Sequence, residues 1–383
     1  MRQATGKSAL LLVVLLAGTG VLRAQTPEGP MAPRPGQPVQ QVPPDVQAKL
    51  KVRVALVNMP VTVRDAKGDM VNSLEAKDFR ITDNGVEQKI SHFDFGGDPV
   101  SAVILIETSS RIDTILPEMR KTGILFTQTV MGSEGEAAVV GFNDAVDKLQ
   151  DFTSDGDAIE NVVTHLQTGT SGSKLYDAMA VGVEMLSGRL PQPTADKPGK
   201  RRVMLVLSET VDAGSEAKLG EVLRKAQLAN VTIYSVGLST TRSELHSKPK
   251  DSRPAPIAPP GIMTLPPQPG TVQTPTTEAN RNSGVDLLGL AIWAVQHADN
   301  KVKDHAMEVA CTATGGAHLA TYKDRSIEKA IDEIGGELHS QYTVGYAPTD
   351  TNDLGYHEIK VQVDRKNLKV RARPGYYLAP PEG

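Results

Sequence analysis

The sequence predicts a doubly wound α/β fold with a mostly parallel six-stranded sheet, flanked by a β-sandwich built from the N- and C-terminal strands. In the middle of the chain, short continuous apolar runs alternate with helical patterns, as in a parallel sheet covered on both faces. Both flanks instead have strand-like patterns. Neither flank is large enough to bury a core alone, so we expect them to share one sandwich.

The N-terminus has the pattern of a secretory signal peptide. Arg2 and Lys7 precede the apolar run "ALLLVVLLAGTGVL", and Ala24 suits a cleavage site. The run is shorter than the roughly 20 apolar residues that a spanning helix needs. We therefore predict a signal peptide over residues 1–24, a secreted or periplasmic protein, and no transmembrane segment after cleavage. An uncleaved anchor is the alternative.

A spacer and a small β region follow. Residues 25–47 are rich in Pro and Gln, which predicts a disordered linker. Residues 48–96 form the N-terminal β region. There, "VRVALVNMPVTVRDAKGDMV" alternates as a strand does, with "DAKGD" as a hairpin turn. The segment "DFRITDNGVEQKISHF" predicts a second hairpin, with Asn84-Gly85 as its turn.

Residues 97–340 carry the α/β pattern. The predicted parallel strands are "SAVILIE", "EAAVVGF", "RRVMLVLS", "VTIYSVGL" and "AHLATY". "AVDKLQDF" follows a tight turn and is expected to add an antiparallel edge strand. Helical patterns cover 113–131, 155–166, 174–188, 215–229, 301–313 and 325–339. The tail, 341–383, returns to strands in "QYTVGYAP", "YHEIKVQVD" and "LKVRARPGYYLA", which we expect to pack with residues 48–96.

A Pro-rich insertion, residues 240–284, interrupts the α/β pattern. Its Pro density forbids helix or central strand, and ordinary loops of such folds are only about 2–6 residues long. We expect it to be mobile and to overhang the carboxyl edge of the sheet, as a lid or partner-binding arm; a passive loop is the alternative. The next helix should dock Leu287, Leu290 and Trp293 against the domain or a partner.

Three motifs occur in the order "VILIETSSRID", "GSKLYDAM" and "VMLVLSETVD". Together they resemble the von Willebrand factor type A (VWA) domain. The chain is similar in detail to the bacterial secreted branch of that family, in which an "EDG-x-x-Q-x-I" segment precedes the domain. Here that segment reads "TDNGVEQKI", and "TGGAHLATY" and "ELHSQYTVGYAP" also fit. The resemblance covers roughly residues 48–378 and implies a Rossmann-like fold.

The resemblance also implies the position of a metal-ion-dependent adhesion site. In the family, Asp-x-Ser-x-Ser follows the first strand, a Thr precedes the "LYDA" helix, and an Asp follows the fourth strand. The matching positions here are Glu107, Ser109, Arg111, Ser173 and Glu209. Both acids are thus lengthened, and one ligand is replaced by a cation.

These replacements argue against metal binding. Mg²⁺ demands near-octahedral oxygen geometry, which a lengthened Glu overshoots. Arg111 offers no acceptor and adds a fixed positive charge. We therefore predict no cofactor and expect Arg111 to replace the metal between Glu107 and Glu209; the alternative is that Arg111 points to solvent. Bound Mg²⁺ or Ca²⁺ is the other alternative, with Asp113 and Asp212 rescuing a looser site.

Other classes of function fit less well. The net charge of −4 and the aromatic content of 4% argue against nucleic-acid binding. "SGSK" at 171–174 and "KTG" at 121–123 match two signatures of penicillin-recognising enzymes, but in the wrong order and without Ser-Asp-Asn. The eight histidines show no zinc spacing. We therefore assign no catalytic residue.

The sequence thus predicts an exported, non-enzymatic protein that binds another protein, in adhesion or as a scaffold of the cell envelope. The alternatives are a metal-dependent adhesion module with a rescued site, or an uncharacterised secreted enzyme. Neither the partner nor the oligomeric state follows from the sequence. Cys311, the only cysteine, is predicted to be a buried small side chain, with an intermolecular disulfide as the alternative.

Overall fold

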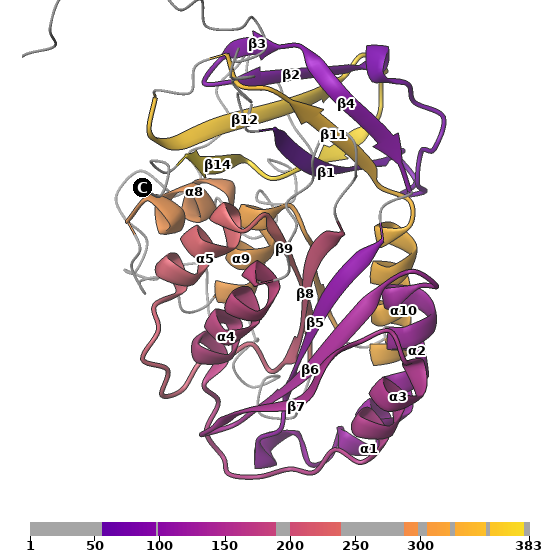
Figure 1. Cartoon of the computed structure of the whole chain (residues 1–383), viewed down its shortest axis with the longest axis vertical. Coiled ribbons are helices and arrows are strands. Elements are labelled where there is room, and N and C mark those ends of the chain that lie inside the picture. Colours follow the sequence, from indigo (N-terminus) through magenta and orange to yellow (C-terminus); the bar gives the residue numbers. More distant parts are fainter. Residues whose placement is uncertain are drawn as a thin grey trace, which may run out of the picture. The chain divides into compact units, whose positions relative to one another are not determined.

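The predicted six-stranded sheet forms the centre of the α/β half of the computed structural model (Figure 1). Its strand order is β10–β9–β8–β5–β6–β7. All neighbours pair in parallel except β7, which runs antiparallel to β6, as predicted for the edge strand. The strands are β5 (Val100–Glu107), β6 (Glu136–Phe142), β7 (Val146–Thr153), β8 (Arg201–Ser208), β9 (Val231–Gly237) and β10 (His318–Ala320).

The structure describes residues 56–96, 99–188, 200–238, 287–297, 305–321, 326–349 and 353–378. The expected signal peptide, linker and Pro-rich insertion lie outside these residues and stay predictions. The three residues singled out for docking, Leu287, Leu290 and Trp293, lie in helix α8, but their side chains are also outside what is described. Among the described helices, none combines the length and apolar character that a bilayer span requires.

Helices cover both faces of the sheet (Figure 1). One face carries α1 (Leu116–Met119), α2 (Gly123–Leu125), α3 (Gly156–Thr164) and α10 (Ile327–Leu338). The other carries α4 (Leu175–Ser187), α5 (Leu219–Leu228), α8 (Leu287–His297) and α9 (Ala306–Thr314). The chain therefore has the doubly wound arrangement that alternating strands and helices predict.

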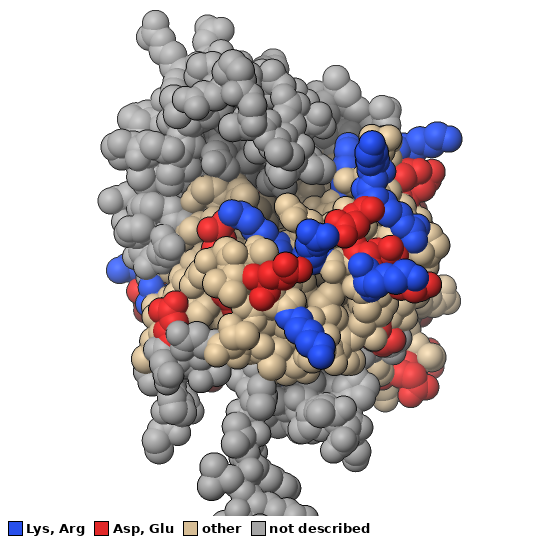
Figure 2. All heavy atoms as spheres, turned by 90° about the horizontal axis from the view of Figure 1, so that it is seen from above, with Lys and Arg blue, Asp and Glu red and all other residues tan. Residues whose placement is uncertain are grey.

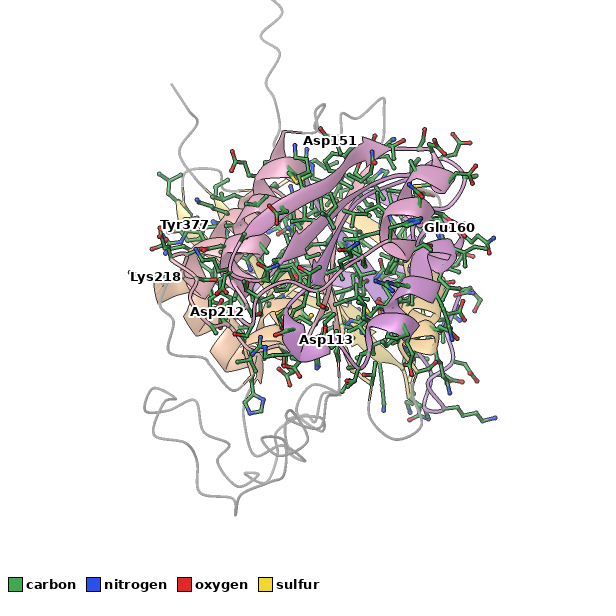
Figure 3. All side chains as sticks on the ribbon, turned by 90° about the horizontal axis from the view of Figure 1, so that it is seen from below. Asp113, Asp151, Glu160, Asp212, Lys218 and Tyr377 are labelled. Carbon is green, nitrogen blue, oxygen red and sulfur yellow. The ribbon has the colours of Figure 1, made fainter. Side chains whose placement is uncertain are left out.

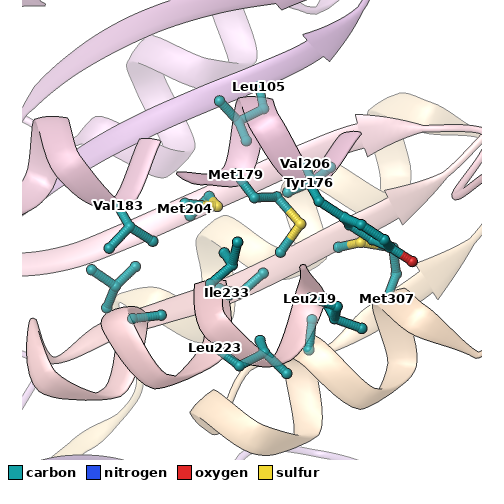
Figure 4. Close-up of a cluster of buried hydrophobic side chains, with 14 of the residues drawn as sticks. Leu105, Tyr176, Met179, Val183, Met204, Val206, Leu219, Leu223, Ile233 and Met307 are labelled. Carbon is teal, nitrogen blue, oxygen red and sulfur yellow. The ribbon is translucent and has the colours of Figure 1, made fainter. Parts of the chain in front are cut away.

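The apolar run of β5 shows why the sheet forms. All eight of its residues are buried, and successive side chains point to opposite faces. Ile104 and Ile106 enter the core beneath α1, α3 and α10, whereas Val103 and Leu105 enter the core beneath α4 and α5. Figure 4 shows this second core, in which Leu105 lies with side chains of α4 and of β8. A strand buried on both sides needs an uninterrupted apolar sequence, which is what the run supplies.

Two four-stranded sheets form the flanking sandwich. Their strand orders are β13–β1–β11–β4 and β14–β12–β2–β3. The N-terminal flank supplies β1 (Val57–Arg64), β2 (Phe79–Asp83), β3 (Val86–Gln88) and β4 (Ile90–Phe95). The C-terminal flank supplies β11 (Tyr342–Tyr346), β12 (Gly355–Val363), β13 (Lys369–Arg371) and β14 (Gly375–Leu378). Each sheet mixes both flanks, so the predicted shared sandwich is confirmed.

One of the two predicted hairpins forms as expected. Asn84 and Gly85 have φ values of 46° and 82° and join β2 to β3. A two-residue turn that requires positive φ at both positions favours Asn-Gly for this reason. However, the strand after β3 is β4, which leaves the hairpin and pairs with β11 in the other sheet.

The other predicted hairpin, around "DAKGD", is reduced to a single bridge between Arg64 and Met70. The predicted turn forms, because Asp65 N–H donates to Asp69 O and Val71 N–H donates to Val63 O, both at 2.9 Å. The prediction of a second full strand after this turn was wrong. β1 pairs with β11 along its first part and with β13 along its last part, so its extended partners come from the C-terminal flank.

Cys311 lies in α9 and is 1% exposed. The prediction of a buried small side chain is confirmed. Burial raises the pKa of its thiol well above the ordinary value, which disfavours the reactive thiolate.

A buried carboxylate joins the sandwich to the α/β half. Glu337, in the last turn of α10, is 4% exposed and pairs with Arg64 of β1 at 3.1 Å and with Arg371 of β13. It also accepts hydrogen bonds from Tyr234 of β9 and from Gln341, at 2.8 and 3.2 Å. Burial and the neighbouring Glu337 carboxylate raise the pKa of Tyr234, so its hydroxyl stays a donor.

The outer face of the sandwich carries charges of both signs. Figure 2 looks onto it from above and shows Lys and Arg intermixed with Asp and Glu on the part that is described. Ion pairs on the sandwich include Arg80–Asp364, Lys360–Glu358 and Arg365–Asp78. Such mixing gives no strong field of one sign over this described face, of the kind that nucleic-acid binding relies on.

Candidate functional site

Three loops meet at the carboxyl edge of the sheet, where the sequence placed its candidate site. Ser110, after β5, donates its backbone N–H to Thr170 O at 3.0 Å. Ser173, before α4, and Ala213, after β8, exchange backbone hydrogen bonds of 3.4 and 2.7 Å. Because β5 starts just after the sandwich strand β4, its carboxyl end lies some 25 Å further along, away from the sandwich.

Glu107, the last residue of β5, is fully buried and saturated with donors. Its Oε1 accepts hydrogen bonds from Ser109 Oγ at 2.6 Å and Arg111 Nη2 at 2.8 Å. Its Oε2 accepts from Ser208 Oγ and from the backbone N–H of Glu209, both at 2.9 Å. A carboxylate offers about four lone-pair positions, and all four are used here.

Arg111 lies in a short 3₁₀ turn, Ser110–Ile112, and folds back over Glu107. Besides its bond to Glu107, its Nε lies 3.4 Å from both Ser109 Oγ and Glu209 Oε2. Its side chain is 13% exposed, whereas those of Glu107 and Glu209 are 0% and 4% exposed. The two lengthened acids therefore converge on one guanidinium, and Arg111 lies inside the cluster rather than in solvent.

The residues present do not fit a Mg²⁺ ion. A metal would need a free oxygen of Glu107, and both of its oxygens are occupied by two donors each. The guanidinium of Arg111 lies between the two acids, so a dication added at that place would be repelled by it. Within the described part of the chain, no three His, Cys, Asp or Glu side chains are arranged to hold a metal ion.

The remaining predicted residues surround the cluster without forming hydrogen bonds to it. Ser173 is fully buried, and its Oγ has no hydrogen-bond partner among the described residues. Asp113 accepts a hydrogen bond from Thr168, whereas Asp212 accepts from Ser215 Oγ at 2.5 Å. Figure 3, viewed from below, labels both acids. Each is thus engaged with other residues of the loops, which leaves the predicted Ca²⁺ rescue without structural support.

Sequence reasoning missed Ser208, which supplies one of the four donors to Glu107. The sequence did contain a sign of this donor, because Ser208 is a hydroxyl residue at the end of β8, the strand that pairs with β5. Its Oγ also accepts a hydrogen bond from Thr210 N at 2.9 Å. Thr210 has a φ of 65°, an uncommon conformation for a non-glycine residue, and it turns the loop back over the cluster.

The two enzyme-like motifs are far from a catalytic arrangement. Lys121–Gly123 lies in the helical segment between α1 and α2, and its Thr122 is fully buried and donates to Met119 O. The Ser-x-x-Lys match, 171–174, lies in the loop before α4, with Lys174 3.8 Å from Asp177. α1 and α2 cover one face of the sheet, whereas α4 covers the opposite face.

Comparison with known proteins gives limited likenesses. No protein-family model matches the sequence, and no curated protein matches it. Solved structures similar to the chain include the conserved hypothetical protein BatB of Bacteroides thetaiotaomicron, at 11% identity and a TM-score of 0.37, over 62% of this chain and 98% of that one. Another is a von Willebrand factor type A protein from Catenulispora acidiphila, at 12% identity and a TM-score of 0.31, over 49% and 42% of the two chains.

A third similar structure is the vWF domain of the type V pilus tip protein Mfa5 of Porphyromonas gingivalis, at 17% identity and a TM-score of 0.27. It covers 32% of this chain and 41% of that one. The last two likenesses bear the name of the family that the sequence resembles. At such low scores they carry no argument about function, and the fold described above rests on strand order and packing.

Proposed function

We propose that this chain is an exported, non-enzymatic protein-binding module of the VWA type, in which an arginine takes the place of a metal ion. The observation that supports this is the position of Arg111 between Glu107 and Glu209 at the carboxyl edge of the sheet. Export is proposed from the signal-peptide pattern of residues 1–24 alone.

The cluster favours a binding role because it fixes the loops around it. Glu107 holds the loop after β5 through Ser109 and Arg111, and the loop after β8 through Ser208 and Glu209. Loops held rigidly on a scaffold are a common place for recognition. The same burial argues against catalysis, because Ser109 Oγ is fully buried and already donates to Glu107.

Binding can be tested with variants of the carboxyl edge. Val211, in the loop after β8, is 46% exposed, and Ser110 is also exposed. We expect Val211→Glu and Ser110→Glu each to reduce capture of partners from envelope extract about tenfold or more, because a desolvated charge at an interface is costly. Immobilised protein and quantitative mass spectrometry measure this.

The matched control for that experiment is Ile124→Glu. Ile124 lies in α2 and is 43% exposed, so the same charge is added to another surface with little effect on folding. Unchanged capture by Ile124→Glu and reduced capture by the edge variants support the proposal. Equal capture by all variants would place the binding surface elsewhere.

Metal binding is tested separately by calorimetry. We expect the wild-type protein to show no Mg²⁺ binding at millimolar ion, because Arg111 fills the place of the metal. The triple variant Arg111→Ser with Glu107→Asp and Glu209→Asp should gain binding with a Kd of about 1 mM or tighter.

The control retains Arg111 and changes only the acids, Glu107→Asp with Glu209→Asp, and should show no gain. The comparison isolates the guanidinium as the obstacle. A tight Mg²⁺ or Ca²⁺ isotherm from the unmodified protein would favour the metal-dependent alternative instead.

A further inference from the structure

A buried acid–imidazole pair lies in the sandwich, away from the carboxyl edge of the α/β sheet. His357 of β12 is 4% exposed, and Asp83 at the end of β2 is 5% exposed. His357 Nδ1 lies 2.8 Å from Asp83 Oδ1, and Nε2 lies 2.6 Å from the backbone oxygen of Asp353, just before β12. Both ring nitrogens therefore face groups that accept hydrogen bonds.

This arrangement fixes the number of protons. A neutral imidazole has one N–H, so it can satisfy only one of its two acceptors, Asp83 or the Asp353 carbonyl. Asp83 Oδ2 additionally accepts hydrogen bonds from Tyr346 Oη at 2.8 Å and Tyr376 Oη at 3.0 Å. A doubly protonated ring donates to both acceptors, so the geometry favours an imidazolium at His357.

Other charged and ionisable groups lie around the pair. Arg373 lies 5.9 Å from the Tyr376 ring centroid and donates to Asn230 Oδ1 and Asn58 O. Burial lowers the pKa of Arg373 to about 10, so it remains a cation near neutrality. The other ionisable groups on the described part of β12 or just before it are Asp353, Tyr356, Glu358 and Lys360. The Asp353 carboxylate accepts from Asn84 Nδ2 at 3.3 Å, and Lys360 pairs with Glu358 at 3.0 Å.

We propose that His357 is a pH-sensitive clasp, which holds the start of β12 while the ring is doubly protonated and releases it when one proton is lost. In the neutral ring, the remaining N–H stays with the Asp83 carboxylate. The lone pair of Nε2 then faces the lone pairs of Asp353 O at 2.6 Å, which is repulsive. The first residue pairs between β12 and β14 lie next to this contact. They are Gly355 with Leu378 and Tyr356 with Tyr377.

The direction of the pH effect follows from the contacts. Burial alone lowers the pKa of His357, but the hydrogen bonds to Asp353 O and Asp83 outweigh it, and the net pKa is raised. A raised pKa in the folded state means that the stabilisation is complete below the unfolded value of about 6.5. It is lost as the pH rises through the folded-state pKa. The clasp is therefore closed in acid and opens as the pH rises through the raised pKa of His357.

Two measurements on the full-length wild-type protein test the clasp. Nitrogen NMR of His357 should show both ring nitrogens protonated at about pH 6. Hydrogen exchange of the amides of residues 354–357, corrected for the intrinsic rate, should be constant in acid. Between the unfolded value of about 6.5 and the raised folded-state pKa, the local opening constant should rise about tenfold per pH unit, because opening then releases one proton, and it should level off above the folded-state pKa.

The variant His357→Gln should lose this pH dependence, because Gln does not titrate. His165→Gln is the matched control, since His165 ends α3 and is exposed. The control should keep the wild-type profile. A neutral His357 at about pH 6, or an opening constant that does not change with pH in the wild-type protein, would overturn the proposal even if His357→Gln failed to fold.

Discussion

Deleting residues 340–383 is expected to remove hydrogen-exchange protection from β1, β2 and β4, although none of these strands is deleted. The physical reason is the strand order. β11 lies between β1 and β4, and β12 pairs with β2, so the deletion removes the central partner of each sheet. Only the short β2–β3 hairpin would keep a partner, and isolated two-stranded hairpins are marginal in water.

The α/β half provides an internal control for this deletion. Its six strands all lie before residue 340, so the amides of β5 and β8 should remain protected. A second control removes only residues 379–383, beyond β14, and should leave all protection unchanged. Protection that persists in residues 57–95 of the longer deletion would show that the N-terminal strands are stable alone.

Replacing Arg111 by Met is expected to lower the free energy of unfolding by about 4 kcal/mol. The substitution removes the only cation within hydrogen-bond or ion-pair distance of Glu107 among the described residues. It leaves the fully buried Glu107 carboxylate without that cation and also removes the contact of Arg111 with Glu209. Losing one partner of a buried ion pair is costly because the remaining charge cannot be hydrated. Urea unfolding followed by circular dichroism measures the change.

Two further variants test the cause of that loss. Adding Glu107→Gln to Arg111→Met should recover part of the stability, because one buried charge is then removed. Lys121→Met removes a cation from an exposed position of the 3₁₀ turn Arg120–Thr122 and should change stability by less than about 0.5 kcal/mol. If Arg111→Met were as mild as Lys121→Met, the cluster would not be an important source of stability.

The sequence was sufficient to predict the fold of the α/β half because the central strands β5, β6, β8 and β9 are buried on both faces. A run such as that of β5 has few alternatives to a central parallel strand, and the helices between the runs follow from their own periodicity. The strand pairing of the sandwich was harder to predict from the sequence. That the flanks share it followed from their size, but the partners of β1 are 281 to 309 residues away in sequence, and local turn chemistry at "DAKGD" favoured a nearer partner.

The candidate site shows a similar limit. The resemblance to the VWA family assigned Glu107, Arg111 and Glu209 to one site, and their charges then indicated that the two acids would converge on the cation of Arg111. The structure places the three together. The identity of the remaining hydrogen-bond donors to Glu107 depends on how the ends of neighbouring strands align. That alignment is set by strand register and cannot be read from composition. Ser208 reaches Glu107 because β8 and β5 are adjacent and in parallel register up to Leu207 and Ile106.

The point where the chain leaves the sandwich and the point where it returns are joined by a hydrogen bond. Gly96 donates its backbone N–H to Gln341 O at 2.9 Å. In an unfolded chain, bringing residues so distant together costs conformational entropy that grows with the logarithm of the loop length. Once the α/β half has folded, its own two ends are already side by side. The two halves of the sandwich are then held close together, as if by a short linker, so this connection favours folding of the sandwich after the α/β half.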